Sequence, residues 1–135
     1  MAENGSFQLK IISPDRVFFE GETDFVELNT TEGELGILKN HIPLTAILAP
    51  GVLRIHNGGD VREAALHRGF MEILPEGVMI LAEVCEWPEE IDINRANEAK
   101  IRAERHLKSP GYDFTRANAA LMRSLIRLRV ARDKN

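Results

Sequence analysis

Arginines are concentrated in the last third of the chain, where they could bind an anion. Arg95 is the most informative of them, because it lies three positions after Asp92 at the start of a predicted helix. Asp92 is suited to be a helix N-cap, since its carboxylate can accept a hydrogen bond from an N–H group of the first turn. A cation such as Arg95 is disfavoured at that positive end of the helix dipole. An anionic partner would explain its presence, and an ion pair with Glu90 or Glu98 is the alternative.

The sequence gives little support for a catalytic or metal site. The four histidines are scattered without the spacing of metal ligands. The GxSxG, GxxxxGK[ST] and GxGxxG motifs of hydrolases and phosphate-binding loops do not occur in it. The glycine-rich stretch Gly33-Glu34-Leu35-Gly36 has no Lys or Ser/Thr for phosphates, so its glycines are more typical of tight turns. We therefore expect a non-catalytic protein without a metal.

Charge is divided unevenly along the 135 residues. Residues 1–90 have 6 Lys/Arg against 16 Asp/Glu, whereas residues 91–135 have 11 against 5. This division indicates either attraction between the two halves or an acidic partner for the basic half. The mean hydropathy of -0.20 is that of a soluble chain, and no apolar run approaches the roughly 18 residues of a membrane span. The N-terminus does not resemble a signal peptide, and the single cysteine, Cys85, is expected to be a core thiol in a reducing compartment.

The segment from Glu86 to Ala96 separates two sequence patterns. Before it, apolar and polar residues alternate and Gly/Pro turns recur about every 8 to 12 residues, which predicts an antiparallel β-sandwich or flattened barrel. The clearest turn signal is Asn57-Gly58-Gly59-Asp60, which is typical of a hairpin. The expected strands are 7–12, 17–19, 25–28, 34–38, 44–48, 52–56, 61–67, 70–74 and 78–84.

After that segment the apolar spacing becomes helical. One helix is predicted from about Ile93 to Lys108 and a second from about Phe114 to Arg132, with Asp113 as the cap of the second. The break at Ser109-Pro110-Gly111 is short, which predicts an antiparallel helical hairpin. The chain therefore has two expected parts, a β-sandwich at 1–87 and a helical hairpin at 88–135. The predicted apolar stripes are Ala96, Ala99, Ala103 and Leu107 on the first helix and Phe114, Ala117, Leu121, Leu125 and Leu128 on the second.

Four motifs follow one another along the sandwich half. They are Gly33 to Leu38, His41 to Leu44, Gly51 to Ile55 and Gly69 to Ile73. In this order they resemble the epsilon subunit of bacterial and chloroplast F-type ATP synthases, and the resemblance covers about Phe7 to Arg132. It implies a rotor subunit of the central stalk, in which the sandwich joins the gamma subunit to the c-ring during proton-driven ATP synthesis. It also implies a peripheral location at the cytoplasmic face of the bacterial cell membrane.

The same resemblance implies how the two parts are used. The turn with Glu32 and Glu34 would lie toward the c-ring, and the stretch with Leu38, His41 and Ile42 would lie toward gamma. The apolar residues from 35 to 44 exceed what one strand face would bury, which also favours an interface. The hairpin would permit ATP hydrolysis when folded and inhibit it when extended into the alpha/beta catalytic head.

A narrower resemblance concerns the stretch from Ile91 to Ala96. It fits the [I/L]-D-x-x-R-A pattern of Bacillus-type epsilon subunits, which bind ATP in the folded hairpin. ATP, with or without magnesium, would then be a regulatory ligand and not a catalytic cofactor. The alternative is that the arginines of the two helices form ion pairs with Glu98, Glu104 or the acidic sandwich. By position the resemblance places Glu86, Asp92, Arg95 and Ala96 toward the adenosine and Arg102, Arg123 and Arg127 toward the phosphates.

Two other functions stay open at this point. A nucleic-acid-binding adaptor would place the basic helix from Arg116 to Arg132 on phosphates. The chain as a whole is acidic, however, and Tyr112 and Phe114 are the only aromatic residues near that helix, so we do not expect a nucleic-acid partner. A stand-alone ATP sensor would bind nucleotide without joining a larger assembly. Co-purification with gamma would distinguish the ATP synthase prediction from both.

Overall fold

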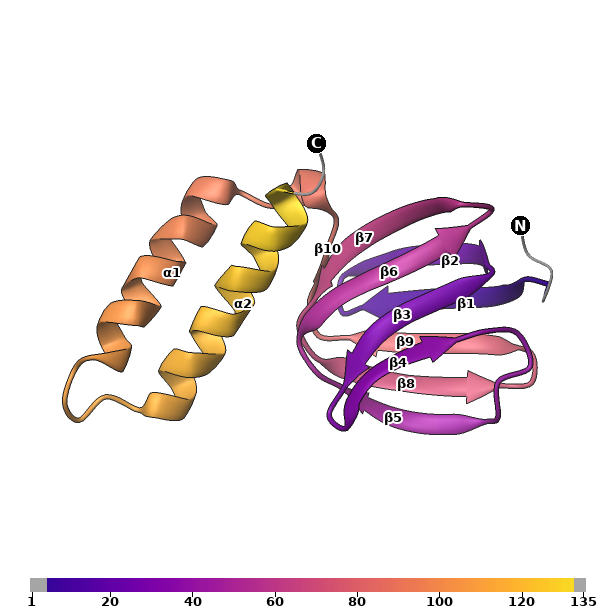
Figure 1. Cartoon of the computed structure of the whole chain (residues 1–135), viewed down its shortest axis with the longest axis horizontal. Helices are drawn as coiled ribbons and strands as arrows, with labels where there is room; N and C mark the ends of the chain where they lie inside the picture. Colours follow the sequence, from indigo (N-terminus) through magenta and orange to yellow (C-terminus); the bar gives the residue numbers. More distant parts are fainter. Residues whose placement is uncertain (1–4, 133–135) are drawn as a thin grey trace. The chain divides into compact units, whose positions relative to one another are not determined.

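The computed structural model describes residues 5–132 and divides the chain into two compact units, Met1–Cys85 and Glu86–Asn135 (Figure 1). The first unit is a β-sandwich and the second is a two-helix hairpin, so the predicted fold class is confirmed. The hairpin unit contains the short 3₁₀ helix η1 (Pro88–Glu90), α1 (Ile93–Leu107) and α2 (Phe114–Arg132). The strands are β1 (Phe7–Ser13), β2 (Arg16–Thr23), β3 (Phe25–Thr30), β4 (Gly33–Ile37), β5 (Leu44–Leu48), β6 (Gly51–Asn57), β7 (Asp60–Leu66), β8 (Gly69–Leu74), β9 (Gly77–Ala82) and β10 (Cys85–Glu86).

The strands form one sheet that folds over into two layers (Figure 1). Their order is β10-β7-β6-β3-β5-β8-β9-β1-β2, and β4 also pairs with β3. In the described residues β3 and β5 are joined through the single register pair Thr30–Leu48, which is where one layer passes into the other. The strands β1 and β9 run parallel, so the sandwich predicted as antiparallel contains one parallel pair. That pair joins the first strand of the unit to one near its end in the sequence. Turn signals within the sequence cannot reveal a pairing over such a distance.

The alternation of apolar residues places the core between the two layers. Leu9 and Ile11 on β1 are fully buried, whereas Phe7 at the start of the strand is only partly buried. Cys85 is also buried. Each large apolar side chain that is fully buried contributes about 1.5 to 3 kcal/mol. The largest of these are Leu9, Ile11, Val26, Ile37, Leu48, Leu53, Met71 and Ile80.

The predicted hairpin at Asn57-Gly58-Gly59-Asp60 is confirmed. Asn57 and Asp60 are register partners at the ends of β6 and β7. The two glycines between them have φ angles of 61° and 95°, a region that is strained for most other residues. Positive φ at both central positions matches the turn geometry that fits the twist of a two-residue hairpin. The turn therefore sets the register of β6 on β7.

Aspartates begin both helices, as the sequence predicted. The Asp92 carboxylate accepts a hydrogen bond from the N–H of Arg95 at 3.1 Å. The Asp113 carboxylate accepts one from the N–H of Arg116 at 3.2 Å. Among the described elements α2 is the main neighbour of α1, and α1 buries only alanines, Ala96 and Ala103. The two helices are therefore in contact through small side chains on the α1 side.

The predicted apolar stripe of α2 is partly wrong. Ala117 is buried, but Phe114 is 67% exposed and Leu125 is 40% exposed. Apolar residues occur around most of the α2 circumference, so their spacing does not select one face. The buried residues of this helix are Ala117, Ser124, Ile126, Val130 and Ala131.

We predict that a chain ending after residue 87 folds without the hairpin. The sandwich unit contains its own turns, and most of the large buried apolar residues belong to it. Thermal unfolding followed by far-ultraviolet circular dichroism should show a cooperative transition of a β-type spectrum. A truncated chain without a cooperative transition would contradict the division into two folding units.

Candidate functional site

Two of the predicted ATP-site residues are in direct contact within the helical unit. The Arg127 side chain donates a hydrogen bond from Nε to Glu86 Oε1 at 2.8 Å. Both side chains are partly buried, with 30% of Arg127 and 24% of Glu86 exposed. The pair joins the segment before η1 to the last third of α2, across 41 positions of sequence. It positions the guanidinium of Arg127, whose remaining N–H groups have the fork geometry that binds carboxylates and phosphates.

The start of α1 brings together three further predicted residues. The Asp92 carboxylate is used as the cap that receives the N–H of Arg95, while the Arg95 side chain is exposed and Ala96 is buried. The alternative in which Arg95 pairs with Glu90 or Glu98 is wrong. The Glu90 carboxylate instead accepts a hydrogen bond from the N–H of Trp87 at 2.9 Å, and Arg95 forms no ion pair within residues 5–132.

Arg102 on α1 and Arg123 on α2 are both exposed. Neither forms an ion pair with any residue of the described range, so the pairs with Glu98 or Glu104 that the sequence left open are not formed. For Arg127 the ion-pair alternative holds, because its partner Glu86 is an acidic residue of the range 1–87 that the sequence predicted as sandwich. The cations Arg102 and Arg123 are therefore available to an anion.

The antiparallel helices bring Arg95 and Arg127 to the same level and leave Arg102 and Arg123 about one turn apart. Arg95 lies 12 residues before the end of α1 at Leu107, and Arg127 lies 13 residues after the start of α2 at Phe114. By the same count Arg102 and Arg123 differ by 4 residues, or about one helical turn. The structure thus places four arginines on two neighbouring helices.

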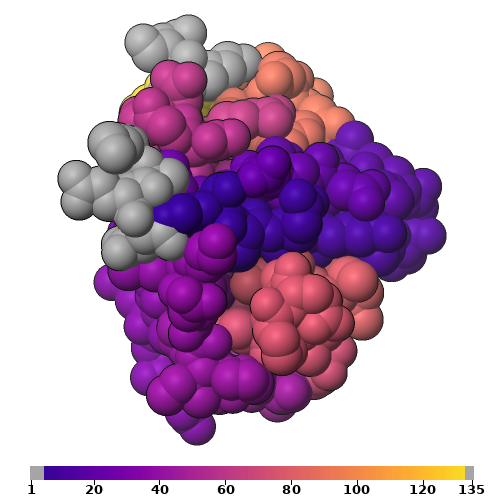
Figure 2. Space-filling view, turned by 90° about the vertical axis from the view of Figure 1, so that its right-hand side faces the viewer, coloured from indigo at the N-terminus to yellow at the C-terminus, as the bar shows by residue number. Residues whose placement is uncertain are grey.

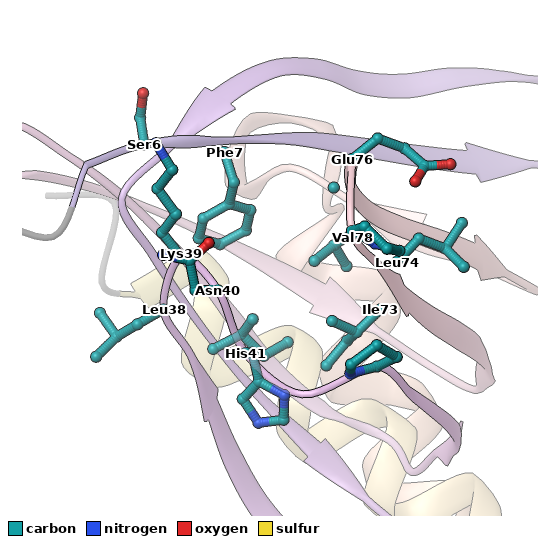
Figure 3. A pocket seen from close by; sticks show the side chains of 14 residues that line it. Ser6, Phe7, Leu38, Lys39, Asn40, His41, Ile73, Leu74, Glu76 and Val78 are labelled. Carbon is teal, nitrogen blue, oxygen red and sulfur yellow. The ribbon is translucent and has the colours of Figure 1, made fainter.

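The predicted gamma-facing residues lie at one end of the sandwich. There the loop between β4 and β5, the turn between β8 and β9, and the start of β1 lie side by side, in purple, salmon and indigo in Figure 2. Between them is a pocket of about 340 Å³ whose lining includes Leu38 and His41. In Figure 3, Phe7 and Val78 face each other across this pocket and Leu38 points away from it. His41 is half-buried and donates a hydrogen bond from Nδ1 to the carbonyl of Ile42 at 2.7 Å.

The remaining predicted interface residues are exposed. Ile42 is 77% exposed and Leu38 is 44% exposed. Glu32 and Glu34 are exposed at the turn between β3 and β4. The Thr30 hydroxyl holds that turn, because it accepts from the N–H of Glu32 at 3.1 Å and donates to the carbonyl of Gly33 at 2.8 Å.

The sequence prediction missed a row of apolar residues on the outer face of the second layer. Residues that are register partners on adjacent strands lie side by side on one face. Four register pairs connect β5, β8, β9, β1 and β2 in this way. Three members of the row are 62%, 48% and 52% exposed, namely Ile47, Leu81 and Val17. This row, the apolar ladder, consists of Ile47, Phe70, Leu81, Ile12 and Val17. Apolar residues at both odd and even positions of β5, β8 and β9 are the signal that could have revealed it.

A shallow pocket of about 430 Å³ lies along the apolar ladder. Its lining includes Ile47, Phe70 and Leu81 together with the charged residues Arg68 and Glu83. Arg68 has a φ of 151°, an uncommon conformation for a residue with a side chain. Its carbonyl accepts a hydrogen bond from the N–H of Glu83 at 2.8 Å. The apolar face is therefore bordered by a pair of opposite charges.

Comparison with known proteins identifies the family. Residues 6–88 match the β-sandwich domain of the ATP synthase delta/epsilon chain, and residues 89–132 match its long α-helix domain. The chain belongs to the epsilon-chain family of F-type ATP synthases. It is 46% identical over 129 residues to the ATP synthase epsilon chain of Caldanaerobacter subterraneus, covering 93% of this chain and 94% of that one. Identity to the epsilon chain of Shouchella clausii is 45% over 129 residues, with 96% and 97% covered.

A solved structure supports the assignment. The chain resembles one subunit in the cryo-EM structure of the Euglena gracilis mitochondrial ATP synthase that contains OSCP, F1 and the c-ring. The TM-score is 0.81 at 25% identity, with 93% of this chain and 81% of that one covered. These matches favour an epsilon chain over the nucleic-acid-binding adaptor.

Two further findings concern membrane-spanning helices and metal sites. Neither α1 nor α2 combines the length and the hydrophobicity of a transmembrane helix. Within residues 5–132 the His, Cys, Asp and Glu side chains form no cluster suited to a metal ion.

We predict that Arg127→Ala destabilises the helical unit and that Arg123→Ala does not. Removing Arg127 takes away its 2.8 Å hydrogen bond to the partly buried Glu86 carboxylate, at a cost of about 1 kcal/mol. Arg123 is exposed and unpaired within the described residues, so its loss should change stability by less than about 0.5 kcal/mol. Urea unfolding followed by helical circular dichroism, without nucleotide, measures the difference. Equal effects of the two substitutions would contradict a stabilising role for the Glu86–Arg127 pair.

Proposed function

We propose that this epsilon chain is a non-catalytic subunit with two roles, mechanical coupling in the rotor and ATP-dependent regulation. In the coupling role the sandwich binds gamma and the c-ring, and the subunit is peripheral to the cytoplasmic face of the membrane. In the regulatory role ATP holds the hairpin folded and so relieves inhibition of ATP hydrolysis in the alpha/beta head. The apolar ladder is the observation that carries the first role.

The apolar ladder fits a gamma-binding surface because it is both apolar and rigid. Its residues lie on five paired strands, so their backbone positions are fixed by the sheet. A contiguous exposed apolar surface of this kind usually marks an interaction site. A rotor contact has to transmit torque, which a row of side chains on paired strands can do better than a loop. Leu38, His41 and Ile42 extend the proposed gamma surface.

The exposed acidic turn between β3 and β4 is the proposed c-ring contact. Glu32 and Glu34 present carboxylates that can accept hydrogen bonds from a polar or basic partner surface. The turn is ordered by the two hydrogen bonds of Thr30, so little conformational entropy would be lost when it binds. The family resemblance implies the same partner for this turn.

We predict that Ile47→Asp weakens the affinity for gamma at least tenfold while leaving the melting temperature of the isolated chain almost unchanged. The reason is that Ile47 is 62% exposed in the isolated chain, and a charge is costly only where a partner would bury it. Ile42→Asp should have the same effect. Titration of labelled chain with gamma measures the affinity.

Val61→Asp is the matched control for these variants. Val61 is 48% exposed on β7 and does not belong to the ladder, so this substitution should leave the affinity for gamma unchanged. If Ile47→Asp and Ile42→Asp bind gamma as tightly as the unmodified chain does, the ladder and Ile42 are not the gamma surface. A parallel loss of stability and binding would instead assign the side chain to the core.

Unpaired cations support the regulatory role. Arg95, Arg102 and Arg123 are exposed and have no ion pair in the described range. A triphosphate near the helices would turn their mutual repulsion into charge-assisted hydrogen bonds of roughly 1.5 to 3 kcal/mol each. Arg127 is engaged with Glu86 without ligand, so phosphates would share or replace that contact. Asp92 and Ala96 would lie nearer the adenosine, as the family resemblance implies.

A ligand of modest affinity can control this hairpin because the hairpin is marginal. The buried side chains of α1 are alanines, each of which contributes about 0.8 kcal/mol by burial. A ligand at about 100 times its dissociation constant adds roughly 2.7 kcal/mol to the folded state. A contribution of that size decides an equilibrium that is close to balanced.

We predict that the isolated chain binds ATP without hydrolysing it, and that Arg123→Ala and Arg127→Ala each weaken binding. The loss of one charge-assisted hydrogen bond corresponds to an affinity decrease of about 10- to 150-fold. Isothermal titration calorimetry at millimolar ATP, with and without magnesium, measures it. Arg129→Ala on the same helix is the control, because Arg129 is exposed and lies about 120° to 160° around the helix from the other two.

Two results would contradict the ATP site. One is the absence of heat from the unmodified chain. The other is an unchanged affinity in both Arg123→Ala and Arg127→Ala, which would leave the arginines as partners for an acidic surface of the catalytic head. Release of phosphate by the isolated chain would contradict its non-catalytic role.

A further inference from the structure

The turn between the two helices contains an aromatic stack. The rings of His106 and Tyr112 are nearly parallel, with an interplanar angle of 11° and centroids 4.0 Å apart. His106 belongs to the last turn of α1, and Tyr112 lies two residues before the start of α2. The stack therefore closes the loop that reverses the chain.

Backbone hydrogen bonds and one glycine shape this loop around the stack. The Ser109 hydroxyl donates to the carbonyl of Arg105 at 3.0 Å, and the N–H of Tyr112 donates to the carbonyl of Ser109 at 3.3 Å. Gly111 has a φ of 81°, a left-handed conformation that other residues adopt only with strain. The loop is a defined turn, and it brings a side chain from each side of the break into contact.

The stack cannot form if the chain continues through this point as one helix. In one continuous helix, residues 106 and 112 would be about 9 Å apart along the axis and about 120° apart around it. Helical residues contact one another at separations of three or four, not six. Straightening the loop into a helix therefore separates the two rings.

We propose that the His106–Tyr112 stack is an intramolecular latch that favours the folded hairpin over a form in which α1 and α2 continue as one helix. This inference rests on the proposed regulatory function, because a latch matters only if the hairpin opens. The alanine-based contact of α1 gives the latch its influence, since little else on that helix opposes opening. An aromatic pair typically shifts an equilibrium by about 2- to 12-fold beyond burial alone.

Thiol labelling in the full chain measures the opening. A cysteine introduced as Ala103→Cys, in a Cys85→Ala background, reports separation of the helices because Ala103 is 2% exposed and α2 is the main neighbour of α1. When reclosing is fast, the labelling rate is proportional to the open fraction. Tyr112→Ala should raise the rate about 2- to 12-fold without ATP, with helical circular dichroism unchanged.

Three comparisons make the result specific. Tyr112→Phe keeps a ring and should label at the unmodified rate. Phe114→Ala removes an aromatic side chain that is 67% exposed and two residues away, and it should have no effect. In a His106→Ala background, Tyr112→Ala should add nothing further, because the pair is already broken.

The latch is wrong if Tyr112→Ala labels at the unmodified rate, if its effect persists in full without His106, or if the faster labelling comes with a loss of helix. Repeating the labelling with ATP distinguishes a failure of the latch from a failure of the proposed ATP regulation. If ATP slows labelling of the unmodified chain but Tyr112→Ala does not speed it, the latch fails and the ATP role stands. If Tyr112→Ala speeds labelling but ATP has no effect, the latch stands and the ATP role fails.

Discussion

The helical unit depends on the small size of the side chains that α1 buries. Ala96 and Ala103 allow the two helices to approach closely, but they remove little apolar area from water. A contact of this kind leaves the hairpin without the surplus stability of a leucine-rich core. Terms of about 1 kcal/mol, such as a helix cap, an ion pair or an aromatic stack, then become decisive. The caps at Asp92 and Asp113, the Glu86–Arg127 pair and the loop between the helices supply terms of this size.

The sandwich, in contrast to the helical unit, has a core of large side chains. Its interior holds large side chains such as Leu53, Met71 and Ile80 that are fully buried, and its strands are tied to one another by register pairs. Apolar residues are nevertheless left outside on the ladder, for example Ile47 and Leu81. A unit whose core is complete can keep such residues exposed for a partner. This contrast suits the two proposed roles, a fixed coupling surface for the sandwich and a switch for the hairpin.

Local chemistry could be predicted from the sequence, whereas long-range pairing could not. Asp92 and Asp113 were correctly predicted as caps, because capping depends on residues within three positions. The hairpin at Gly58 and Gly59 was correctly predicted for the same reason. The parallel pairing of β1 with β9 was not, since nothing near either strand specifies a partner about 70 residues away.

Long-range contacts could not be predicted from the sequence at the candidate site either. The family pattern around Arg95 indicated which residues to consider, but not that Glu86 and Arg127 would bond each other across 41 positions. The buried face of α2 was predicted incorrectly at Phe114 and Leu125, because a helix with apolar residues on several sides does not specify one. The apolar ladder was missed because strands that are apolar on both faces look the same whether they are covered or exposed.

The Glu86–Arg127 ion pair and the His106–Tyr112 stack lie at different places along the hairpin, so they can contribute separately to the proposed switch. The Glu86–Arg127 pair lies 13 residues into α2 from Phe114, and the His106–Tyr112 stack lies at the loop, so about 20 Å of helix separates them. They share no residue, and effects of sites this far apart usually add. The stack would then set the equilibrium between the folded and the open hairpin without ligand, and an anion bound at the arginines would shift that equilibrium. Because the two contributions are separable, a substitution in the loop would change the response to ATP without any change in the arginines that we propose as phosphate ligands.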